Sequence, residues 1–386
     1  MADHAKLSPS SAARWLTCTA SVAMEEGIED QQSSYAAEGT YAHALCELEG
    51  KYAVGQITKR QLTAAKKKIY SEEFHNAEVE EASLEYATYI KEEFRRLKKT
   101  CDVVVCEFET RLDLSKWAPG SFGTADCIII AGDVLHVIDF KYGKGVKVEA
   151  EGNPQMMLYA GGALELYGSL YDIEMVKYTI IQPRLGGVSE ASSGAQELVS
   201  WLENTVAVKA EEANSGKGAF APSESACRFC KAKAICEARA EYFLGLFDDD
   251  PEPGKLTLDR VGEILEKAKD MEAWLKDLKA LAYGALMKGE PVKGWKLVEG
   301  RSNRKITDED KAAKLLIEAG LTEEDIYTKK FITLTALEDR LGAKTTAETL
   351  GDLLVKPKGR PSLAPASDKK PEIHPEEAVL NQFEEE

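Results

Sequence analysis

The sequence has no run of about 18 apolar residues, the length that a helix needs to cross a membrane, so a membrane span is excluded. Its first six residues lack the apolar core of a signal peptide. We therefore expect a cytoplasmic protein, in which the eight cysteines are core residues or ligands and not disulfides. With 386 residues, 44% apolar and 30% charged, the chain is typical of a globular protein of two to three domains.

Basic residues are outnumbered, because 49 Lys and Arg face 66 Asp and Glu, for a net charge of −17. The excess is confined to residues 71–93, 241–253 and 367–386, which carry −7, −5 and −5. The remainder is neutral, and residues 51–70 hold six Lys and Arg with no acid. A basic stripe alone is more often a solvated surface than a binding site. The net charge nevertheless leaves a polyanionic partner possible, because local stripes supply phosphate contacts.

Hydrophobic periodicity divides the chain into an α/β part and a helical part. Helical spacing predicts helices over residues 33–51 and 72–99. Alternation of apolar residues predicts strands over residues 103–109, 125–130, 134–140 and 176–182. Between the last two strands, Asn153-Pro154 predicts the cap and first residue of a crossover helix that ends at Leu166. Strands joined by such a helix make an α/β core.

Composition then predicts four regions along the chain. An α/β domain covers residues 1–246, and an acidic, Pro-rich linker follows at 247–255. Residues 256–356 have helical spacing and predict a mostly helical domain. Residues 357–386 are rich in Pro, Lys and Glu and poor in aromatics, so we expect a disordered acidic tail.

Two carboxylates and an amine lie on the two strands of the predicted hairpin. Gly123-Thr124-Ala125-Asp126 begins one strand, and Asp139-Phe140-Lys141 ends its partner, 13 residues after Asp126. Because side chains alternate along a strand, Asp139 and Lys141 share a face while Phe140 points to the core. Two carboxylates beside a Lys can hold Mg²⁺ and position a water for attack on a phosphodiester. An isolated Asp-x-Lys is more often a surface ion pair.

Two sets of residues at helical spacing accompany these groups. Gly39, His43 and Glu47 follow one another at intervals of four, which places them on one face of a helix. His43 can supply a nitrogen ligand to the same metal, with Glu47 orienting it. Gln155 and Tyr159 are also four apart, at the start of the crossover helix, within reach of the Lys, the water or a DNA backbone.

In this order, the segments Gly-x-x-x-His-x-x-x-Glu, Gly-Thr-Ala-Asp, Asp-Phe-Lys and Gln-x-x-x-Tyr resemble the motif series of the RecB branch of the PD-(D/E)xK nucleases. The resemblance covers roughly residues 8–245 and implies a restriction-endonuclease-like core, a mixed sheet flanked by helices. The sequence departs from this motif series at two points: Asp139 stands where many relatives have Glu, and no Pro precedes Asp126. The resemblance implies these site residues: metal ligands His43, Asp126, Asp139 and the Phe140 carbonyl; catalytic Lys141; supporting Gln155, Tyr159 and Glu47.

A run of cysteines forms a second constellation. Cys227, Cys230 and Cys236 make a Cys-x₂-Cys-x₅-Cys pattern, which is a strong ligand signal in a cytosolic protein. The candidate fourth ligand is Cys18, which lies 209 residues before Cys227. Four thiolates accept Zn²⁺ or an iron–sulfur cluster, and spacing alone favours zinc. The other four, Cys46, Cys101, Cys106 and Cys127, fall in predicted helices or strands and are expected in the core.

The cysteine pattern also resembles a known arrangement, the 4Fe–4S "iron staple" of AddB-type and CRISPR-adaptation exonucleases, in which a distant N-terminal cysteine joins a C-terminal triplet. The resemblance implies a cluster that holds the two ends of the nuclease core together. The complete pattern, with its opening Ser-Pro-Ser-Ser-Ala-Ala-Arg-Trp-Leu-x-Cys, further resembles an uncharacterised family encoded by bacteriophages and prophages.

These resemblances imply a Mg²⁺- or Mn²⁺-dependent DNA exonuclease that acts on single strands or duplex ends. Its implied partners are phage recombination or replication proteins, and its location is the bacterial host cytoplasm. A different class remains open, namely a catalytically inactive nuclease fold that binds DNA or acts as a scaffold. A third is an interaction module stabilised by zinc.

Overall fold

The computed structural model describes residues 5–28, 34–71, 73–185, 187–245, 258–297, 311 and 333–353. The chain separates into two compact units, Met1–Asp277 and Leu278–Glu386, and the division falls inside helix α11 (Leu258–Met287). The expected acidic linker, 247–255, and the expected tail, 357–386, lie outside the described residues. Each unit is therefore considered by itself.

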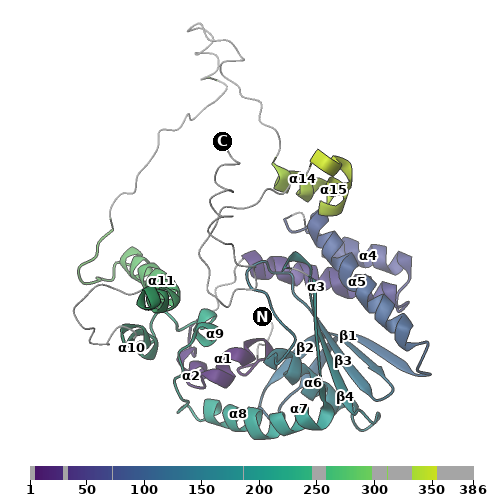
Figure 1. Ribbon diagram of the computed structural model, residues 1–386, viewed down its shortest axis with the longest axis horizontal. Helices are drawn as coiled ribbons and strands as arrows, with labels where there is room; N and C mark the ends of the chain where they lie inside the picture. The colour runs from purple at the N-terminus through teal and green to yellow at the C-terminus, as the bar shows by residue number, and fades with distance from the viewer. Residues whose placement is uncertain are drawn as a thin grey trace. The chain divides into compact units, whose positions relative to one another are not determined.

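The first unit is built on a five-stranded mixed sheet flanked by helices (Figure 1). Its strands are β1 (Val104–Asp113), β2 (Phe122–Ala131), β3 (Val134–Phe140), β4 (Met175–Gln182) and β5 (Gly187–Gly194), and they lie in chain order. All neighbours are antiparallel except β3 and β4, which are parallel. The parallel pair needs a crossover, and α6 (Pro154–Tyr167) supplies it.

The remaining helices of this unit are short except for the three that follow one another before the sheet. These three are α3 (Ser34–Ala53), α4 (Lys59–Ile69) and α5 (Ala77–Leu97). The others are α1 (Ala12–Thr17), α2 (Ser21–Met24), α7 (Ala195–Trp201), a π-helical turn (Leu202–Val206), α8 (Ala207–Asn214), α9 (Glu224–Arg228) and α10 (Glu237–Gly245), with 3₁₀ turns at Pro9–Ser11 and Pro183–Leu185.

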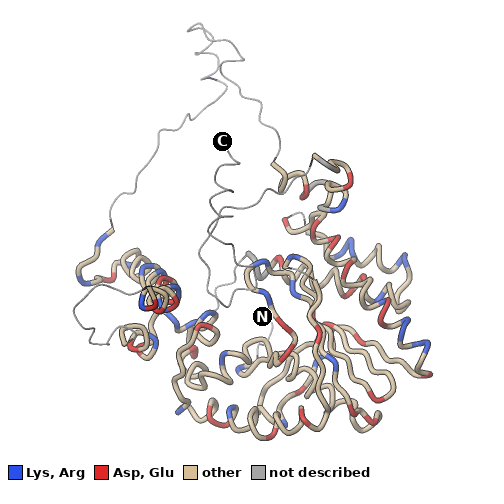
Figure 2. Tube along the Cα trace, viewed as in Figure 1, with Lys and Arg blue, Asp and Glu red and all other residues tan. Residues whose placement is uncertain are grey.

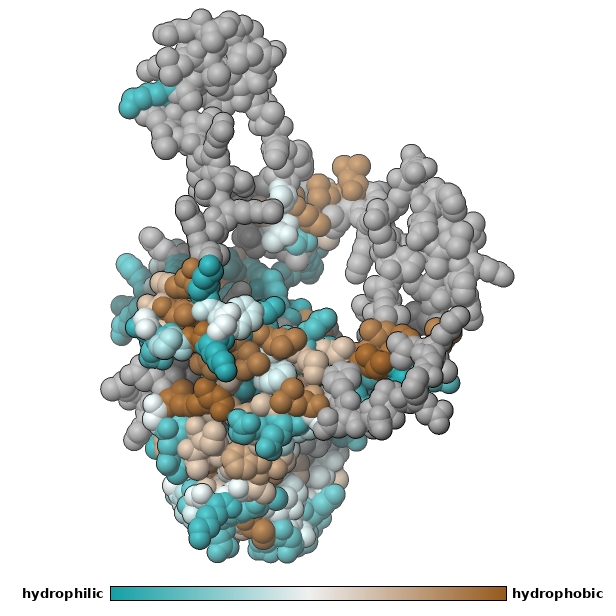
Figure 3. All heavy atoms as spheres, turned by 90° about the vertical axis from the view of Figure 1, so that its left-hand side faces the viewer, coloured by the Kyte–Doolittle hydropathy of each residue, from teal (hydrophilic) through white to brown (hydrophobic). Residues whose placement is uncertain are grey.

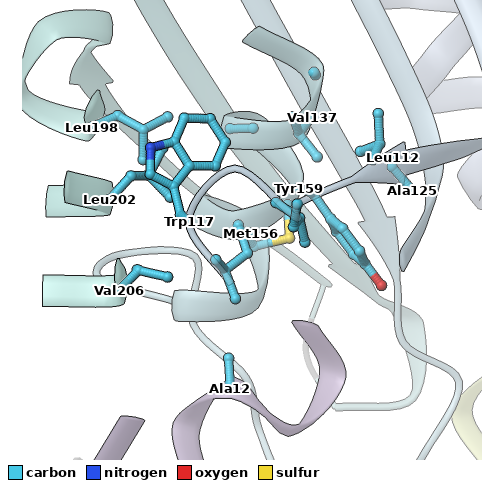
Figure 4. Close-up of a cluster of buried hydrophobic side chains, with 14 of the residues drawn as sticks. Ala12, Leu112, Trp117, Ala125, Val137, Met156, Tyr159, Leu198, Leu202 and Val206 are labelled. Atoms are coloured by element: carbon cyan, nitrogen blue, oxygen red, sulfur yellow. The ribbon is translucent and has the colours of Figure 1, made fainter. Parts of the chain in front are cut away.

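Side chains of the central strands alternate between two buried cores, because both faces of the sheet are covered. One core contains strand residues Ile128, Leu135, Val137, Val176 and Ile180 together with side chains of α1, α6, α7 and α8. Figure 4 shows the Tyr159 ring of α6 within this cluster. The opposite core contains strand residues Cys127, Ile129, Ile138, Phe140 and Ile181 with side chains of α3 and α5. The unit therefore has three layers, with helices on each side of the sheet.

Local sequence signals located α3, α5, α6 and four of the five strands of the sheet, but not β5 or the short helices. The strand expected over 134–140 has the same bounds as β3, and the hairpin turns at Gly132, whose φ of 62° favours glycine. Asn153 caps α6 as expected, because its side chain accepts hydrogen bonds from the amides of Gln155 and Met156. Cys46, Cys106 and Cys127 are buried as expected, whereas Cys101 lies in the turn after α5 and is only half-buried.

Several expected element boundaries differ from those in the structure, and one helix was not expected. Helix α5 begins at Ala77 and not at 72, because the Asn76 side chain accepts the hydrogen bond of the Val79 amide and starts the helix there. Asp126 lies in the middle of β2 and not at its start. The basic stripe 51–70 contains α4, whose start carries a reciprocal capping box between Thr58 and Gln61.

Residues 288–297 form turns and irregular chain, whereas the regular elements described in α11 and the second unit are all helices. They include α14 (Leu334–Leu341) and α15 (Ala343–Leu350), followed by a 3₁₀ turn at Gly351–Leu353. Helix α11 is 30 residues long and exposes Leu258, Leu265 and Leu275. Figure 3 views the side on which α10 and α11 lie in Figure 1, and hydrophobic residues are visible at the surface there. In the part of the chain that the structure describes, no helix combines the length and the apolar character needed to span a membrane.

The N-terminal segment packs against the chain that follows α8. The Ala20 amide donates to the Ala219 carbonyl at 3.1 Å, and the Ala219 amide donates to the Thr19 hydroxyl at 2.7 Å. Gly218 makes this approach possible, since a Cβ there would lie 2.4 Å from Thr19 C and from Ala20 N. Segments about 200 residues apart in the sequence are thus joined through their backbones.

We expect Gly218→Ala to destabilise the first unit by about 1–3 kcal/mol, because the added methyl group meets backbone atoms that cannot move independently. Urea unfolding followed by far-ultraviolet circular dichroism measures the change. Gly262→Ala in α11 is the matched control, since a Cβ at Gly262 meets nothing within 4 Å. Equal unfolding midpoints for the two variants would show that the close approach contributes nothing.

Candidate functional site

Asp126 and Asp139 stand where the β2–β3 ladder stops. The two strands pair with each other up to Cys127 and Ile138, and Asp126 and Asp139 are the next residues beyond that pair. One residue further on, Asp126 Oδ2 accepts a hydrogen bond of 2.7 Å from the Phe140 amide. Both carboxylates have little solvent contact, with side-chain exposures of 13% for Asp126 and 3% for Asp139. Buried acids of this kind need partners, and the neighbouring helices provide them.

Helix α3 brings His43 to this pair. His43 Nδ1 lies 3.0 Å from Asp126 Oδ1, and the imidazole stands edge-on to the Phe140 ring with centroids 5.5 Å apart. The buried side chains of Ala42, Leu45 and Cys46 hold the helix in place, because they pack in one core with side chains of α5. His43 therefore reaches the acids from the helical layer, as its spacing predicted.

Lys141 and the start of α6 complete the group. Lys141 Nζ lies 2.9 Å from Asp139 Oδ2 and donates to Gln155 Oε1 at 3.1 Å. The side-chain nitrogen of Gln155, Nε2, donates to Tyr159 Oη at 3.1 Å and to Asp139 Oδ1 at 3.4 Å. Gln155 and Tyr159 are adjacent because they are one turn apart in a helix whose first turn Asn153 caps.

The charges of the group are strongly coupled. Burial lowers the pKa of His43, but the Asp126 carboxylate outweighs it and, with Asp139, raises that pKa to about 9. Burial tends to raise the pKa of Asp126, yet His43 and the Phe140 amide bring it below its ordinary value. The pKa of Asp139 is raised, chiefly by burial. Burial opposes the charge on Lys141, but the two carboxylates raise the pKa of its ammonium group. Without a metal, His43 and Lys141 are therefore both cationic at neutral pH.

Glu109 belongs to the same group, although it had no role in the sequence analysis. Single ligand atoms of Glu109, His43 and Asp126 all lie within 4.8 Å of one another. Its φ of 52° is the one positive value among the described residues other than glycine. Burial and the neighbouring Asp126 raise the pKa of Glu109 to about 7, although His43 opposes them. The expected strand 103–109 ended on this residue, but only the β1–β2 register places it opposite Asp126.

Glu47 has a different partner from the one expected. Its carboxylate pairs with Lys51, one turn later on α3, at 2.5 Å. It is still close enough to contribute to the raised pKa of Glu109. The structure therefore places Glu47 beside the group and pairs it with a lysine, while Glu109 lies close to His43 together with Asp126.

The donors suit a hard divalent cation. Single carboxylate oxygens of Asp126 and Glu109 and one imidazole nitrogen of His43 lie within 4.8 Å of one another, and these are ligands that Mg²⁺ and Mn²⁺ accept. Asp139 is not one of these three, but it neighbours Phe140, whose amide Asp126 binds. The Phe140 amide is engaged by Asp126, which holds the Asp139–Phe140 peptide unit next to the Asp126 carboxylate. The chain's own residues thus fit the expected metal, and the neighbouring Lys141 adds a fixed positive charge.

The four expected cysteine ligands line one cavity in the first unit. They are Cys18 at the end of α1, Cys227 in α9, and Cys230 and Cys236 in the turns that follow. All four are free thiols. Burial raises the pKa of Cys227, with the Cys18 and Cys236 thiols adding to the effect, and burial raises the pKa of Cys230 to about 11. The four side chains therefore line the same cavity, and burial disfavours the charged thiolate form of Cys227 and Cys230.

A buried ion pair holds the two cysteine segments together. Arg14 Nη2 lies 2.8 Å from Glu25 Oε2, with side-chain exposures of 13% and 11%. Across the junction, Arg14 donates to the Phe229 carbonyl at 3.3 Å, and the Lys231 amide donates to Glu25 at 2.7 Å. Two charged side chains of the N-terminal segment thus bind the backbone on either side of Cys230.

In the metal-free protein we expect His43 to titrate near pH 9, and Asp126→Asn to lower that pKa, because Asp126 is the largest group favouring the charged imidazole. Since the folded pKa exceeds 6.5, the pair's stabilisation is complete below pH 6.5 and is lost as the pH rises to about 9. Nuclear magnetic resonance of the histidine ring protons measures both. His136, whose pKa is lowered mainly by burial, is the internal control. Titration of His43 near 6.5 in both proteins would contradict the coupling.

Several solved structures and one family model match this chain. The chain is similar to a solved structure described as "Crystal structure of SSO0001", at 18% identity over 57% of this chain and 95% of that chain, with a TM-score of 0.24. A likeness with this TM-score carries no argument about fold or function. A family model described as "Protein of unknown function (DUF2800)" matches residues 4–371. The chain therefore belongs to the DUF2800 family.

Proposed function

We propose that this protein is a metal-dependent DNA exonuclease with a core of the PD-(D/E)xK type, which hydrolyses phosphodiester bonds at single strands or duplex ends. One observation carries the proposal: His43, Asp126, Asp139 and Lys141 come from three separate elements and form a single connected group. A surface Asp–Lys pair on a hairpin would require neither burial of both acids nor an imidazole beside them.

The residues divide into those that hold a metal and those that position water and substrate. His43, Asp126, Asp139 and the Phe140 carbonyl would hold Mg²⁺ or Mn²⁺, and Glu109 is close enough to join them. When bound, the ion neutralises charge on the phosphate and makes a neighbouring water more acidic. Because binding requires a neutral imidazole, His43 gives up the proton that it shares with Asp126.

Lys141 acts as a donor in this scheme. Its ammonium group has a raised pKa and so keeps its proton at neutral pH. Held by Asp139 and by Gln155 Oε1, it offers a remaining hydrogen to an attacking water or to a phosphate oxygen. Gln155 is itself fixed by Tyr159, whose ring is packed in the core beneath α6. The pair therefore keeps the lysine in one position.

We further propose that Cys18, Cys227, Cys230 and Cys236 bind a 4Fe–4S cluster that closes the ends of the first unit. The proposal is supported by their shared cavity and by the Arg14–Glu25 contacts around it. The cluster would contribute folding free energy and no redox step. The same four thiolates would also fit a structural Zn²⁺, which the metal content distinguishes.

We expect Lys141→Ala and Asp126→Asn each to lower the rate of DNA hydrolysis at least about 100-fold, because the first removes the proposed donor to water or phosphate and the second removes a proposed metal ligand. End-labelled single- and double-stranded substrates with Mg²⁺ or Mn²⁺ measure the rate. Lys116→Ala is the control, since Lys116 is exposed and its contacts, an ion pair with Glu165 and the Trp117 ring, lie outside the proposed site.

Two results would remove the nuclease proposal. Degradation at the parental rate by the Lys141 and Asp126 variants would mean that the site is wrongly assigned. A gel shift with DNA but no cleavage by the parent protein in Mn²⁺ would instead indicate an inactive nuclease fold that binds DNA.

For the cysteine site we expect protein purified without oxygen to be brown and to contain about four iron atoms per chain. Cys230→Ser should lose the colour and lower the unfolding midpoint, because a ligand of a structural cluster contributes to folding. Cys101→Ser, at a half-buried cysteine outside the cavity, should change neither. A colourless, iron-free, zinc-replete and active preparation would rule the cluster out.

A further inference from the structure

A second cavity lies on the helical layer, between α3, α4 and the start of α5 (Figure 1). Its volume is about 330 Å³, which is within the range of small-molecule sites. Its wall is aromatic and charged, with Tyr41, Tyr70, His75, Lys66, Lys67 and Glu80, and we call it the α4 pocket. Nothing in the proposed metal centre uses these residues.

The α4 pocket and the metal centre lie on opposite sides of α3. Tyr41 lines the pocket, and His43 belongs to the metal centre. Two residues in a helix are about 200° apart around its axis. The two sites therefore share one helix without sharing a side chain.

The aromatic wall has a buried base and an exposed rim. Tyr41, which is 7% exposed, shares a hydrogen bond of 2.8 Å with His75 Nδ1, and their rings meet edge to face. Tyr70, which is 56% exposed, lies against the same His75 with ring centroids 5.0 Å apart. The inner pair fixes the His75 ring, and Tyr70 presents a large aromatic face to solvent beside it. Such a surface suits a planar ring that stacks on it.

The two lysines of the pocket differ in their charged partners. Lys66 lies 2.5 Å from Glu49 and 2.8 Å from Glu80, so its charge is already matched by two acids. Lys67 points from the same helix into the pocket's wall, is exposed, and forms no ion pair with any described residue. It is the cation that the pocket can offer to an anionic ligand.

The surroundings extend this positive charge along α4. Lys59, Arg60 and Lys68 are also exposed and form no ion pair within the described ranges, and residues 51–70 contain no acid. Figure 2 shows the basic segments along this helix. The pocket is therefore the aromatic part of a basic strip, a combination that binds single-stranded nucleic acid by stacking bases and tracking phosphates.

We infer that the α4 pocket binds one nucleotide of a single DNA strand, with the base on Tyr70 and His75 and its phosphate at Lys67. The inference names a second contact for the substrate and so rests on the proposed function. A paired base cannot stack in such a pocket, because its faces are covered by its neighbours in the duplex. The pocket would thus hold a strand outside the metal centre and favour single-stranded DNA.

The test uses the full chain carrying Lys141→Ala, so that the strand stays intact, and a fluorescent oligo-dT of about 16 nucleotides. Fluorescence anisotropy at several salt concentrations gives the affinity and its salt dependence. Adding Tyr70→Ala should weaken binding about fivefold or more, with an unchanged salt slope. Adding Lys67→Ala should reduce the slope of log K against log salt by about 0.7, the value for one phosphate contact of a single strand.

Matched surface variants show whether these effects belong to the pocket. Tyr52→Ala and Lys99→Ala each remove a side chain of the same type that is exposed and lies outside the pocket. They should leave the affinity and the slope unchanged, and none of the four variants should change the unfolding midpoint. Equal affinities for the Tyr70 and Tyr52 variants would overturn the inference. The inference would also be overturned if the pocket bound dTMP through Tyr70 and Lys67 while the affinity for the oligonucleotide depended on neither residue.

The outcome is separate from that of the nuclease assay. A parent protein that binds the strand through Tyr70 and Lys67 but cleaves nothing would support the pocket and remove the nuclease proposal. A protein that cleaves DNA while the pocket variants bind normally would remove the pocket alone.

Discussion

The Asp126 carboxylate links helix α3 to the sheet at the point where β2 and β3 stop pairing with each other. Its two oxygens meet His43 of α3 and the backbone amide of Phe140 at the end of β3. The β2–β3 ladder has stopped one residue earlier, so this side chain takes over the pairing that the backbone no longer makes. A buried charge is tolerated only with such partners. The contact that closes the fold here is therefore the same contact that assembles the candidate site.

The N-terminal segment supports this arrangement from the other side of the sheet. A Cβ at Gly123 would lie 2.8 Å from Pro9 and from Tyr159, so the chain before α1 packs directly against both the Asp126 strand and α6. A few residues later the same segment carries Arg14, whose ion pair with Glu25 frames the cysteine cavity. The two candidate sites are thus connected through one short stretch of chain, which explains how closing the ends of the unit would also steady the metal centre.

Prediction from the sequence succeeded where the signal was local. The cap at Asn153, the turn at Gly132 and the bounds of β3 follow from residues that lie next to one another in the chain. It failed where a distant partner decides. Glu47 has the helical spacing of an orienting acid, but Lys51 is nearer, and Glu109 reaches His43 only because β1 and β2 pair in one register. Periodicity assigns a residue to a strand and says nothing about which residue lies opposite.

The sequence by itself determined the kinds of ligand available, namely an imidazole, acids and a lysine in helical and strand spacing, and a cysteine triplet with a distant fourth member. Only the tertiary structure decided that Glu109 joins the acids, that Cys18 faces Cys227, and that a basic strip carries an aromatic pocket. The physical reason is the range of the forces involved. Helix caps and side-chain alternation act over a few residues, whereas burial, strand register and charge coupling depend on segments that meet only when the chain has folded.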